Sequence, residues 1–226
     1  MPGNSVILFT EESLSILDED FGLVSTMDYS AVFPDQVLRK MKCVEPDLTK
    51  DYRGFLIAFT NSGANFPDAI LSNNVYEGRN QQEHETSWIA RFTIDEQGQL
   101  IRVGGLASSL LLRRERVTAM LECAREKILV SEPKGSLLLF HNWQCIRVYV
   151  DDDLRNINKI HLCPLPGFDE FKFPFVACCG RESITLVNLN EDYMGTLIKS
   201  RTASKRGQRA FFFRREAYGL SLHFVQ

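Results

Sequence analysis

The sequence predicts an all-β protein made of a recurring antiparallel unit of about four short strands. Three observations lead to this prediction: one segment contains four strand-like runs joined by turn residues, similar runs recur along the chain, and the recurrences are regularly spaced. With 226 residues, 44% of them hydrophobic and 24% charged, the chain can build a substantial core as a single domain over residues 1–226.

The clearest unit lies between Arg116 and Asp151. The turn residues Pro133, Lys134 and Gly135 divide it into halves, and each half carries two apolar or β-branched runs. A meander of four strands cannot bury both of its faces alone, so we expect neighbouring copies to cover it. The four runs are Arg116–Cys123, Lys127–Ser131, Ser136–Phe140 and Cys145–Val150.

Similar runs occur on both sides of this unit. Near the N-terminus they form a copy that lacks its first strand, and near the C-terminus a shorter copy has only two strands. The N-terminal copy consists of Val6–Thr10, Ser13–Asp18 and Leu23–Met27; the next of Arg53–Thr60, Ser87–Phe92 and Leu100–Val103; the fourth of Asn158–Cys163, Phe175–Cys179, Ser183–Asn188 and Tyr193–Ile198; and the last of Ala210–Arg214 and Gly219–Val225.

The spacing between copies indicates a particular all-β architecture. The runs that correspond to the third strand of the complete unit start at Ser13, Ser87, Ser136, Ser183 and Gly219. Successive starts are therefore 74, 49, 47 and 36 residues apart. Propeller blades repeat every roughly 40–45 residues, and the longest interval contains an inserted loop at 61–86. The sequence therefore predicts a β-propeller-like array of about four to five four-stranded antiparallel blades, either an incomplete ring or one closed by its two ends. A segment of a longer propeller and an all-β sandwich are the alternatives.

Two segments allow either a strand or a helix. Val37–Val44 alternates like a strand, but its apolar positions also suit one face of a helix. Apolar residues between Leu110 and Lys127 also recur at helical spacing. We favour strands there, with Leu110–Leu112 ending one blade and Val117–Leu121 starting the next, because the strands on both sides require them.

The inserted loop at 61–86 is rich in Asn, Gly and Gln. A loop of this length in a compact domain is usually functional or disordered. It is either a surface insertion without a role or an arm that folds against another protein chain. The apolar residues of such an arm are Phe66, Ile70, Leu71, Val75 and Tyr76.

The strongest feature unrelated to strand formation is a basic segment at 199–215. It holds seven of the 26 basic residues of the chain within 17 positions, interleaved with Ser, Thr and Gly. Such a segment could bind the phosphates of RNA or of an anionic lipid such as a phosphoinositide; alternatively it is a solvated connection balanced by nearby acidic residues. The candidate binding residues are Lys199, Arg201, Lys205, Arg206, Arg209, Arg214 and Arg215.

Catalytic and metal-binding motifs are missing from the sequence. It contains no P-loop, no dinucleotide-binding glycine turn, and no zinc-protease, serine-hydrolase or paired-cysteine motif. His141, His161 and the nearby cysteines match no zinc-ligand spacing. The adjacent Cys178 and Cys179 lie in a strand-like run, where packing accounts for them better than nucleophilic catalysis does. We therefore predict a protein that is not an enzyme and that uses no cofactor or metal.

Charge and cysteine usage bear on the location of the protein. The formal net charge of −3 gives no global basic field, so any nucleic acid or anionic membrane would have to be bound by a local patch. No stretch has the layout of a signal peptide or the roughly 18–20 apolar residues of a transmembrane segment. The six cysteines lack the density of a secreted disulfide framework. We expect an intracellular protein, cytoplasmic or nuclear, whose cysteines are packed as free thiols.

Two stretches carry a resemblance to a known repeat family. The sequences SEPKGSLLLFHNWQCIRVYVDD and CCGRESITLVNLNEDYMGTLI resemble the central three strands of WD40-type β-propeller blades. Leu17-Asp18 and Val187-Asn188 stand where that family has its Trp-Asp pair, so none of its functional residues is carried over. The resemblance implies a rigid disc whose loops and rims bind other proteins.

Three classes of function follow from these observations. The favoured one is a non-catalytic WD-repeat-like scaffold that mediates protein–protein interactions within a larger complex, with other chains completing the propeller. The second is a phosphate-binding module that uses residues 199–215. A Cys-dependent enzyme is the least favoured of the three.

Overall fold

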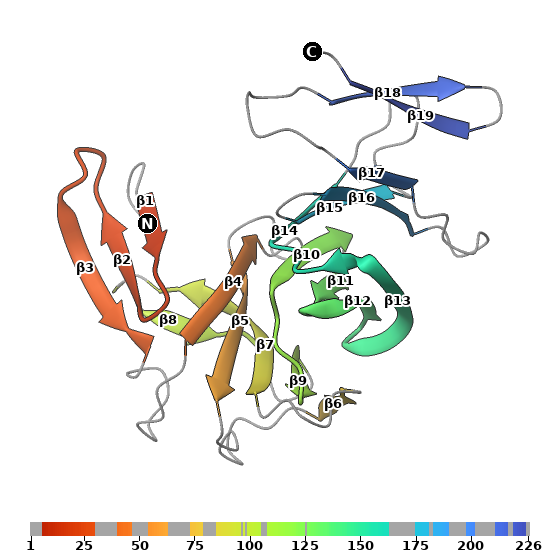
Figure 1. Ribbon diagram of the computed structural model, residues 1–226. Coiled ribbons are helices and arrows are strands. Elements are labelled where there is room, and N and C mark those ends of the chain that lie inside the picture. Colours follow the sequence, from red (N-terminus) through yellow and green to blue (C-terminus); the bar gives the residue numbers. More distant parts are fainter. Residues whose placement is uncertain are drawn as a thin grey trace.

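The computed structural model describes most of the chain as short strands. Within the described residues the regular elements are the strands β1 to β19 (Figure 1), and none is a helix long and apolar enough to cross a membrane. The described residues are 6–29, 40–46, 54–62, 73–78, 85–95, 97, 99–104, 108–124, 126–162, 175–180, 183–189, 198–201, 211–216 and 219–224.

The first sheet is an antiparallel meander of three strands. They are β1 (Val6–Phe9), β2 (Ser13–Leu17) and β3 (Leu23–Asp28), paired in the order β1-β2-β3. These are the three runs that the sequence predicts for the N-terminal copy. The alternation of β2, in which Leu14 and Ile16 are buried between partly exposed neighbours, gives the sheet one buried face.

The second sheet is the largest. Its strand order is β4-β5-β7-β9-β6. One edge of β7 pairs with two strands: residues 87–90 pair with β9, and residues 92–94 pair with β8. Its strands are β4 (Lys40–Pro46), β5 (Phe55–Ser62), β6 (Asn74–Glu77), β7 (Glu85–Ile94), β8 (Leu100–Arg102) and β9 (Ser109–Arg113). The sequence predicts a connecting loop at 61–86, but this segment contains the strand β6, which pairs in parallel with β9. The β-branched Val75 and aromatic Tyr76 favour this strand locally.

The regular elements described between Leu110 and Lys127 are strands, as favoured above. β9 ends the second sheet, and β10 (Ala119–Ala124) begins the third. The buried hydroxyl of Ser87 fixes the connection between them: it donates to the Glu115 carbonyl at 2.9 Å and accepts from the Val117 N–H at 3.2 Å. Because these backbone groups have a partner in β7, the segment does not need helical hydrogen bonds.

The third and fourth sheets are four-stranded antiparallel meanders, as predicted. The third has the order β10-β11-β12-β13, and the fourth β14-β15-β16-β17. The last described strand of the fourth sheet is β17 (Ile198–Arg201), in which Ile198 pairs with Leu186. Of the predicted strand Tyr193–Ile198, residues 193–197 lie outside the described residues. The further strands are β11 (Lys127–Ser131), β12 (Lys134–His141), β13 (Gln144–Arg155), β14 (Lys159–Leu162), β15 (Phe175–Cys179) and β16 (Ser183–Asn188), and β18 (Phe211–Glu216) pairs with β19 (Gly219–Phe224) in a two-stranded hairpin.

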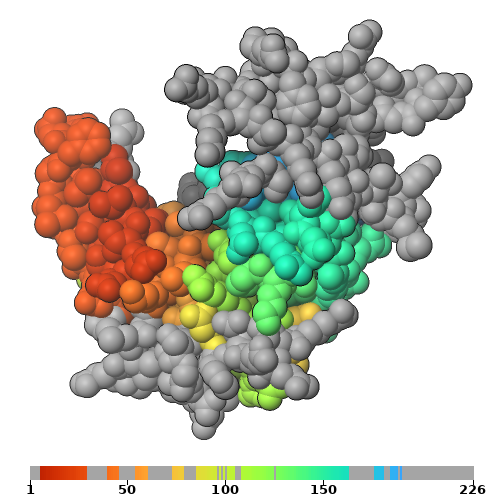
Figure 2. Space-filling model, viewed as in Figure 1, coloured from red at the N-terminus to blue at the C-terminus, as the bar shows by residue number. Residues whose placement is uncertain are grey.

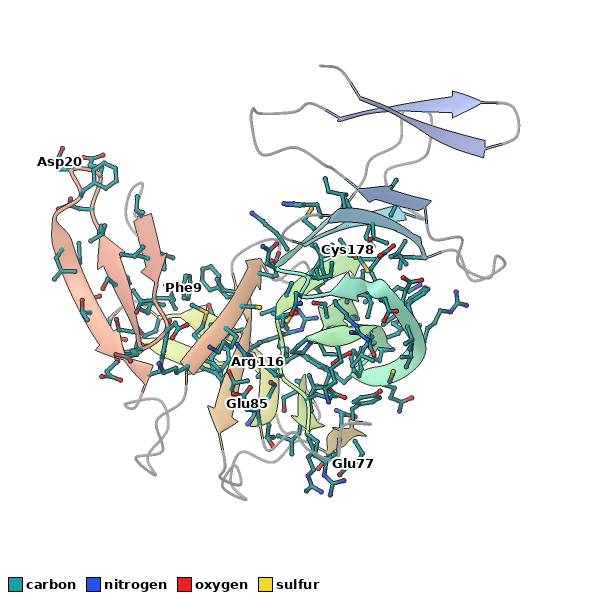
Figure 3. All side chains as sticks on the ribbon, in the orientation of Figure 1. Phe9, Asp20, Glu77, Glu85, Arg116 and Cys178 are labelled. Atoms are coloured by element: carbon teal, nitrogen blue, oxygen red, sulfur yellow. The ribbon has the colours of Figure 1, made fainter. Side chains whose placement is uncertain are left out.

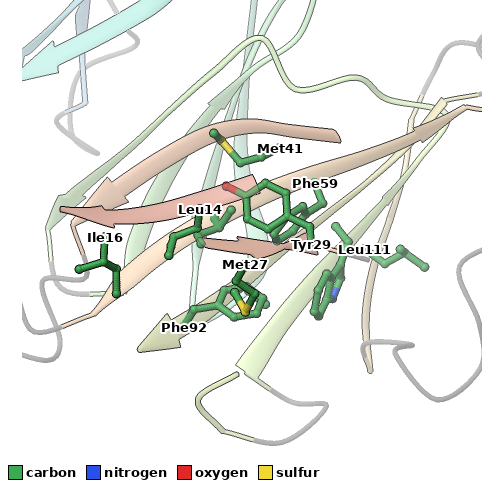
Figure 4. Close-up of a cluster of buried hydrophobic side chains, with 11 residues drawn as sticks. Leu14, Ile16, Met27, Tyr29, Met41, Phe59, Phe92 and Leu111 are labelled. Atoms are coloured by element: carbon green, nitrogen blue, oxygen red, sulfur yellow. The ribbon is translucent and has the colours of Figure 1, made fainter. Parts of the chain in front are cut away.

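Consecutive sheets pack face to face, which follows from the apolar character of both faces of the middle sheets. On β7, Trp88 and Phe92 face the first sheet, whereas Ile89 faces the third. Figure 4 shows the cluster between the first and second sheets. A second cluster joins the second and third sheets, and a third cluster joins the third and fourth sheets around Leu129, Leu137 and Cys178. The sequence of a strand that is buried on both faces is a continuous apolar run, without alternation of apolar and polar residues.

The first strands of three successive sheets lie near one another. β10, which opens the third sheet, lies beside both β4 and β14, which open the second and fourth sheets. An electrostatic interaction also links the carboxyl group of Glu45 on β4 to the ammonium group of Lys159 on β14. The second, third and fourth sheets therefore converge at their opening strands.

Candidate interaction surface

The first sheet has one covered face and one bare face. The covered face contributes Leu14, Ile16 and Met27 to the core, and Phe9 packs edge-on against Phe55 with ring centroids 5.1 Å apart. The other face, which we call the outer face, has Leu8, Ser15 and Thr26 in register across its middle and Val6, Leu17 and Leu23 in the next row. Leu8 is 50% exposed and Leu23 65% exposed, and the Ser15 and Thr26 hydroxyls hydrogen-bond to each other at 2.9 Å.

The first sheet projects from the body of the molecule. In the space-filling view it forms a separate lobe, coloured red to orange, that is joined to the rest near β4 (Figure 2). Phe9 lies at the junction with the body, whereas Asp20 lies at the far end (Figure 3). The exposed apolar side chains of the first sheet are therefore accessible from the outside; they are Val6, Leu8, Phe21, Leu23 and Val24.

Within the described part of the chain, no strand pairs with the edge of β1 that faces away from β2, which we call the open edge. Among the described strands, β1 pairs with β2 alone. Thr10 and Ser13 close the β1–β2 hairpin through a backbone hydrogen bond of 2.9 Å. Alternation along an antiparallel pair then directs the backbone N–H and C=O groups of Ile7 and Phe9 away from β2. The strand consists of Val, Ile, Leu and Phe, without the charges or proline that usually protect such an edge from pairing.

The turn between β2 and β3, residues Asp18–Gly22, is an exposed and well-defined tip. The Asp18 carboxylate accepts from the N–H groups of Asp20 at 3.0 Å and Gly22 at 2.7 Å. Phe21 has φ = 61° and its side chain is 71% exposed. Left-handed backbone costs a non-glycine residue roughly 1–2 kcal/mol, and Phe21 gains no burial in return.

The interface between the second and third sheets contains a buried ion pair. Arg91 on β7 donates to both carboxylate oxygens of Glu122 on β10, at 3.3 and 2.7 Å, and the two side chains are only 8% and 1% exposed. The Trp143 ring covers the guanidinium at 5.4 Å. Trp143 reaches this position because Asn142 and Trp143 form a two-residue turn with φ values of 48° and 65°. These contacts hold the second and third sheets together in a defined alignment.

The predicted basic segment lies only partly within the described residues. Lys199 and Arg201 belong to β17, and Arg214 and Arg215 belong to β18. Lys205, Arg206 and Arg209 lie outside the described residues. A common site for these seven residues therefore stays a prediction.

The predicted partner arm divides in a similar way. Phe66, Ile70 and Leu71 lie outside the described residues. Tyr76 packs its ring edge-on against Phe140 of the third sheet, with centroids 5.8 Å apart, whereas Val75 points outward and is exposed. Within its described part, the arm therefore contacts its own chain through Tyr76, whereas the side chain of Val75 is exposed to solvent.

Three of the cysteines, Cys43, Cys123 and Cys179, lie in environments that disfavour the thiolate. Burial raises the pKa of Cys43 to about 12 and that of Cys123 to about 11. Burial also raises the pKa of Cys179, whereas Cys178 is fully buried in the core between the third and fourth sheets. Because the thiolate is the nucleophile, none of these environments activates a cysteine.

A metal centre finds no support in the described part of the chain. No three His, Cys, Asp or Glu side chains there lie close enough together to hold an ion. His141 and His161, which the sequence analysis considered, are both exposed, and Cys163 lies outside the described residues.

The outer face is the feature that the sequence analysis did not single out. A signal was present, because every residue of β1 is apolar, and this pattern is typical of a strand covered on both sides. Which side lacks a cover is a property of the assembled sheets, so the sequence pattern alone does not reveal it.

Comparisons with known proteins add little. No protein-family model matches the chain, and no curated protein matches it. Similar solved structures include a protein of unknown function from Bacteroides caccae (9% identity, TM-score 0.48, 86% of this chain and 56% of that chain), a chain of the yeast heterotrimeric Nup82-Nup159-Nup116 nucleoporin complex (9%, 0.40, 99% and 85%) and Hsv2 of Kluyvelomyces marxianus (14%, 0.29, 89% and 81%). The chain thus spans about half the length of the first of them. All three TM-scores lie below 0.5, so the likeness carries no argument about function.

Proposed function

We propose that this chain is a non-catalytic scaffold that binds another protein through its first sheet. In this proposal the sheets are blades of an incomplete propeller, and the partner covers the end of the array that the chain leaves open. The observation that carries the proposal is the bare apolar outer face of the first sheet.

The packing of the sheets supports a blade-like arrangement. Four consecutive sheets pack face to face through three apolar clusters, and the opening strands β4, β10 and β14 lie near one another. This combination is expected when antiparallel blades are arranged around an axis with their first strands innermost.

The surroundings of the first sheet favour a β-structured partner. Both faces of the second and third sheets are covered by another sheet, so a sheet is the natural occupant of the outer face as well. The open edge of β1 offers the backbone groups of Ile7 and Phe9 to a further strand. In the second, third and fourth sheets the corresponding edge is occupied by β4, β10 and β14.

A matched pair of variants tests this proposal. Leu8→Ser with Leu23→Ser makes the outer face polar, whereas Ile101→Ser with Val150→Ser changes two exposed apolar residues elsewhere. Quantitative affinity purification should lose a co-purifying protein with the first variant and keep it with the second. A wild-type chain that sediments as a compact monomer at micromolar concentration and retains no protein would contradict the proposal.

The basic segment supports a second candidate function. Seven basic residues within 17 positions are a local charge density that an overall acidic chain does not otherwise have. Replacing Arg206, Arg209, Arg214 and Arg215 with Ala should weaken binding to phosphoinositide vesicles or to RNA and flatten its salt dependence. Equal binding by the wild type and this variant would exclude the phosphate-binding function.

The absence of catalysis is part of the proposal and has its own test. Alkylation of the folded protein with iodoacetamide should leave Cys178 unmodified, because it is fully buried. Rapid modification of Cys178 or Cys179 at neutral pH would instead indicate an activated thiol.

A further inference from the structure

The first sheet lacks the strand that opens each of the next three sheets. In those sheets the opening strand pairs antiparallel with the strand that follows it: β4 with β5, β10 with β11, and β14 with β15. β1 is the counterpart of β5, β11 and β15, because its neighbour β2 corresponds to β7, β12 and β16 in the sequence repeat. Within the described residues, no strand occupies the equivalent edge of β1.

The backbone of this open edge suits one more antiparallel strand. Ile7 and Phe9 direct their N–H and C=O groups away from β2, and no described residue forms a backbone hydrogen bond with them on that side. A strand that is added to such an edge gains affinity from main-chain hydrogen bonds and specificity from its alternate side chains. The opening strands β14, β10 and β4 have 4, 6 and 7 residues, so we expect an added strand of similar length.

The surface below the open edge is apolar. Ile7 and Phe9 belong to the covered face and are only partly buried, as is Val44 on β4, which packs against the same cluster. β10 lies beside β4 and β14 lies beside β10, so an opening strand of the first sheet would lie next to β4. In Figure 1, β1 is on the side of the first sheet nearest β4. Side chains of the added strand opposite Ile7 and Phe9 therefore point toward Val44, where apolar groups are favoured.

The opening strands of the other sheets show the side chains that such a place accepts. Each contributes a buried apolar residue to the core between sheets: Met41 on β4, Met120 on β10 and Ile160 on β14. The first sheet has no such contribution within the described residues, although its Leu14, Ile16 and Met27 are buried in the same manner. The missing component is therefore one strand with apolar residues at alternate positions.

We infer that a partner protein contributes a single extended strand, which pairs antiparallel with β1 and completes the first sheet. The strand has about four to seven residues, and the side chains that it directs toward β4 are apolar. This inference rests on the proposed function and states how the partner of the outer face attaches to the chain.

Two substitutions at one position test the pairing. Ile7→Pro and Ile7→Ala both remove most of the partly buried side chain, whereas only proline removes the N–H group that faces the open edge. Proline at an edge with its missing N–H directed outward leaves the pairing with β2 in place. In quantitative affinity purification, Ile7→Pro should reduce the retained partner at least about tenfold and Ile7→Ala less than about threefold. Urea midpoints of the two variants within about 0.3 M of each other would show that both keep the fold.

Hydrogen exchange of the wild-type chain locates the strand without any substitution. In the purified chain, the amides of Ile7 and Phe9 should exchange at least about tenfold faster than that of Leu8, whose N–H group faces β2. In the complex with the retained partner, the amides of Ile7 and Phe9 should become at least about tenfold slower.

Photo-crosslinking identifies the contributed strand. Benzoylphenylalanine in place of Leu8 should crosslink to one segment of the partner that has apolar residues at alternate positions. A synthetic peptide of that segment should bind the purified chain. Methylation of its amide nitrogens that face β1 should abolish this binding, whereas methylation of those that face away should not.

Three results would overturn the inference: equal retention of the partner by Ile7→Pro and Ile7→Ala, slow exchange of Ile7 and Phe9 in the purified chain alone, or crosslinks to β1 of a second copy of this chain. If one of these occurs while the Leu8→Ser and Leu23→Ser variant still loses a co-purifying protein, the contributed strand is excluded and the proposed scaffold function stands. A wild-type chain that retains no protein would contradict both.

Discussion

The buried ion pair between the second and third sheets gives the most decisive test of the packing. Glu122→Ala leaves the Arg91 guanidinium at a position that is 8% exposed, without its two carboxylate acceptors. It also removes the acceptor of the Glu126 N–H, which lies 3.1 Å from the Glu122 carboxylate. Breaking a buried pair in this way costs about 3–5 kcal/mol, because the remaining charge stays buried after it has lost its counter-charge.

Urea denaturation measures this cost. With a slope of about 2–3 kcal/mol per molar, the loss lowers the midpoint by about 1–2.5 M. The matched control is Glu77→Ala, which breaks the exposed Arg113–Glu77 pair, with side chains that are 51% and 55% exposed. Exposed pairs contribute about 0–1 kcal/mol, so the midpoint of the control should change by less than about 0.5 M.

A double variant separates the effect of charge from that of packing. Arg91→Met with Glu122→Leu removes both charges and keeps apolar volume below Trp143, so its stability should lie within about 1–2 kcal/mol of the wild type. Equal midpoint shifts for Glu122→Ala and Glu77→Ala would refute the buried pair and the proposed alignment of the two sheets.

Three further predictions concern individual residues of the fold. Burial raises the pKa of Glu45 to about 7 from its ordinary 4.5, and the charge of Lys159 only partly offsets this rise. The folded state therefore binds the proton more tightly than the unfolded state does. As the pH rises from about 4.5 to about 7, the free energy of unfolding should fall by about 1 kcal/mol, after allowance for solvent screening. Glu45→Gln should flatten this dependence in urea melts at pH 4 and pH 8, and an unchanged slope would contradict it. Ser87→Ala should cost about 1–3 kcal/mol in the same assay, because the buried Glu115 carbonyl and Val117 N–H lose their partner; a loss below 0.5 kcal/mol would show that water replaces the hydroxyl. Gly135→Ala should cost about 2 kcal/mol or more, since φ is +99° and an added Cβ would lie 2.5 Å from the Asp151 carbonyl oxygen; wild-type thermal stability would contradict this geometry.

Local pattern was sufficient to predict most strands. The runs at Val6, Lys127 and Ser183 alternate or are β-branched and are bounded by turn residues, and each forms a strand at the predicted place. The predicted third strands of the five copies all coincide with observed strands. The choice of strands between Leu110 and Lys127 was also right, although it came from the requirements of neighbouring strands, since the apolar spacing there also suits a helix.

Other features depended on pairing between distant residues. β6 was missed because four residues in an Asn-rich stretch give a weak signal, and it exists through its parallel pairing with β9 and the contact of Tyr76 with Phe140. The last described strand of the fourth sheet, Ile198–Arg201, is likewise defined by its register with β16.

The sequence by itself therefore determined the all-β class and the positions of most strands, because alternation and turn chemistry act over a few residues. The six-stranded second sheet, with its parallel β6–β9 pair, was not predicted. Only the tertiary structure decided which apolar faces are covered. The residues of β1 are apolar on both sides, yet Phe9 is packed and Leu8 is half exposed. Burial depends on which sheet lies opposite, and that neighbour comes from elsewhere in the chain or from another molecule.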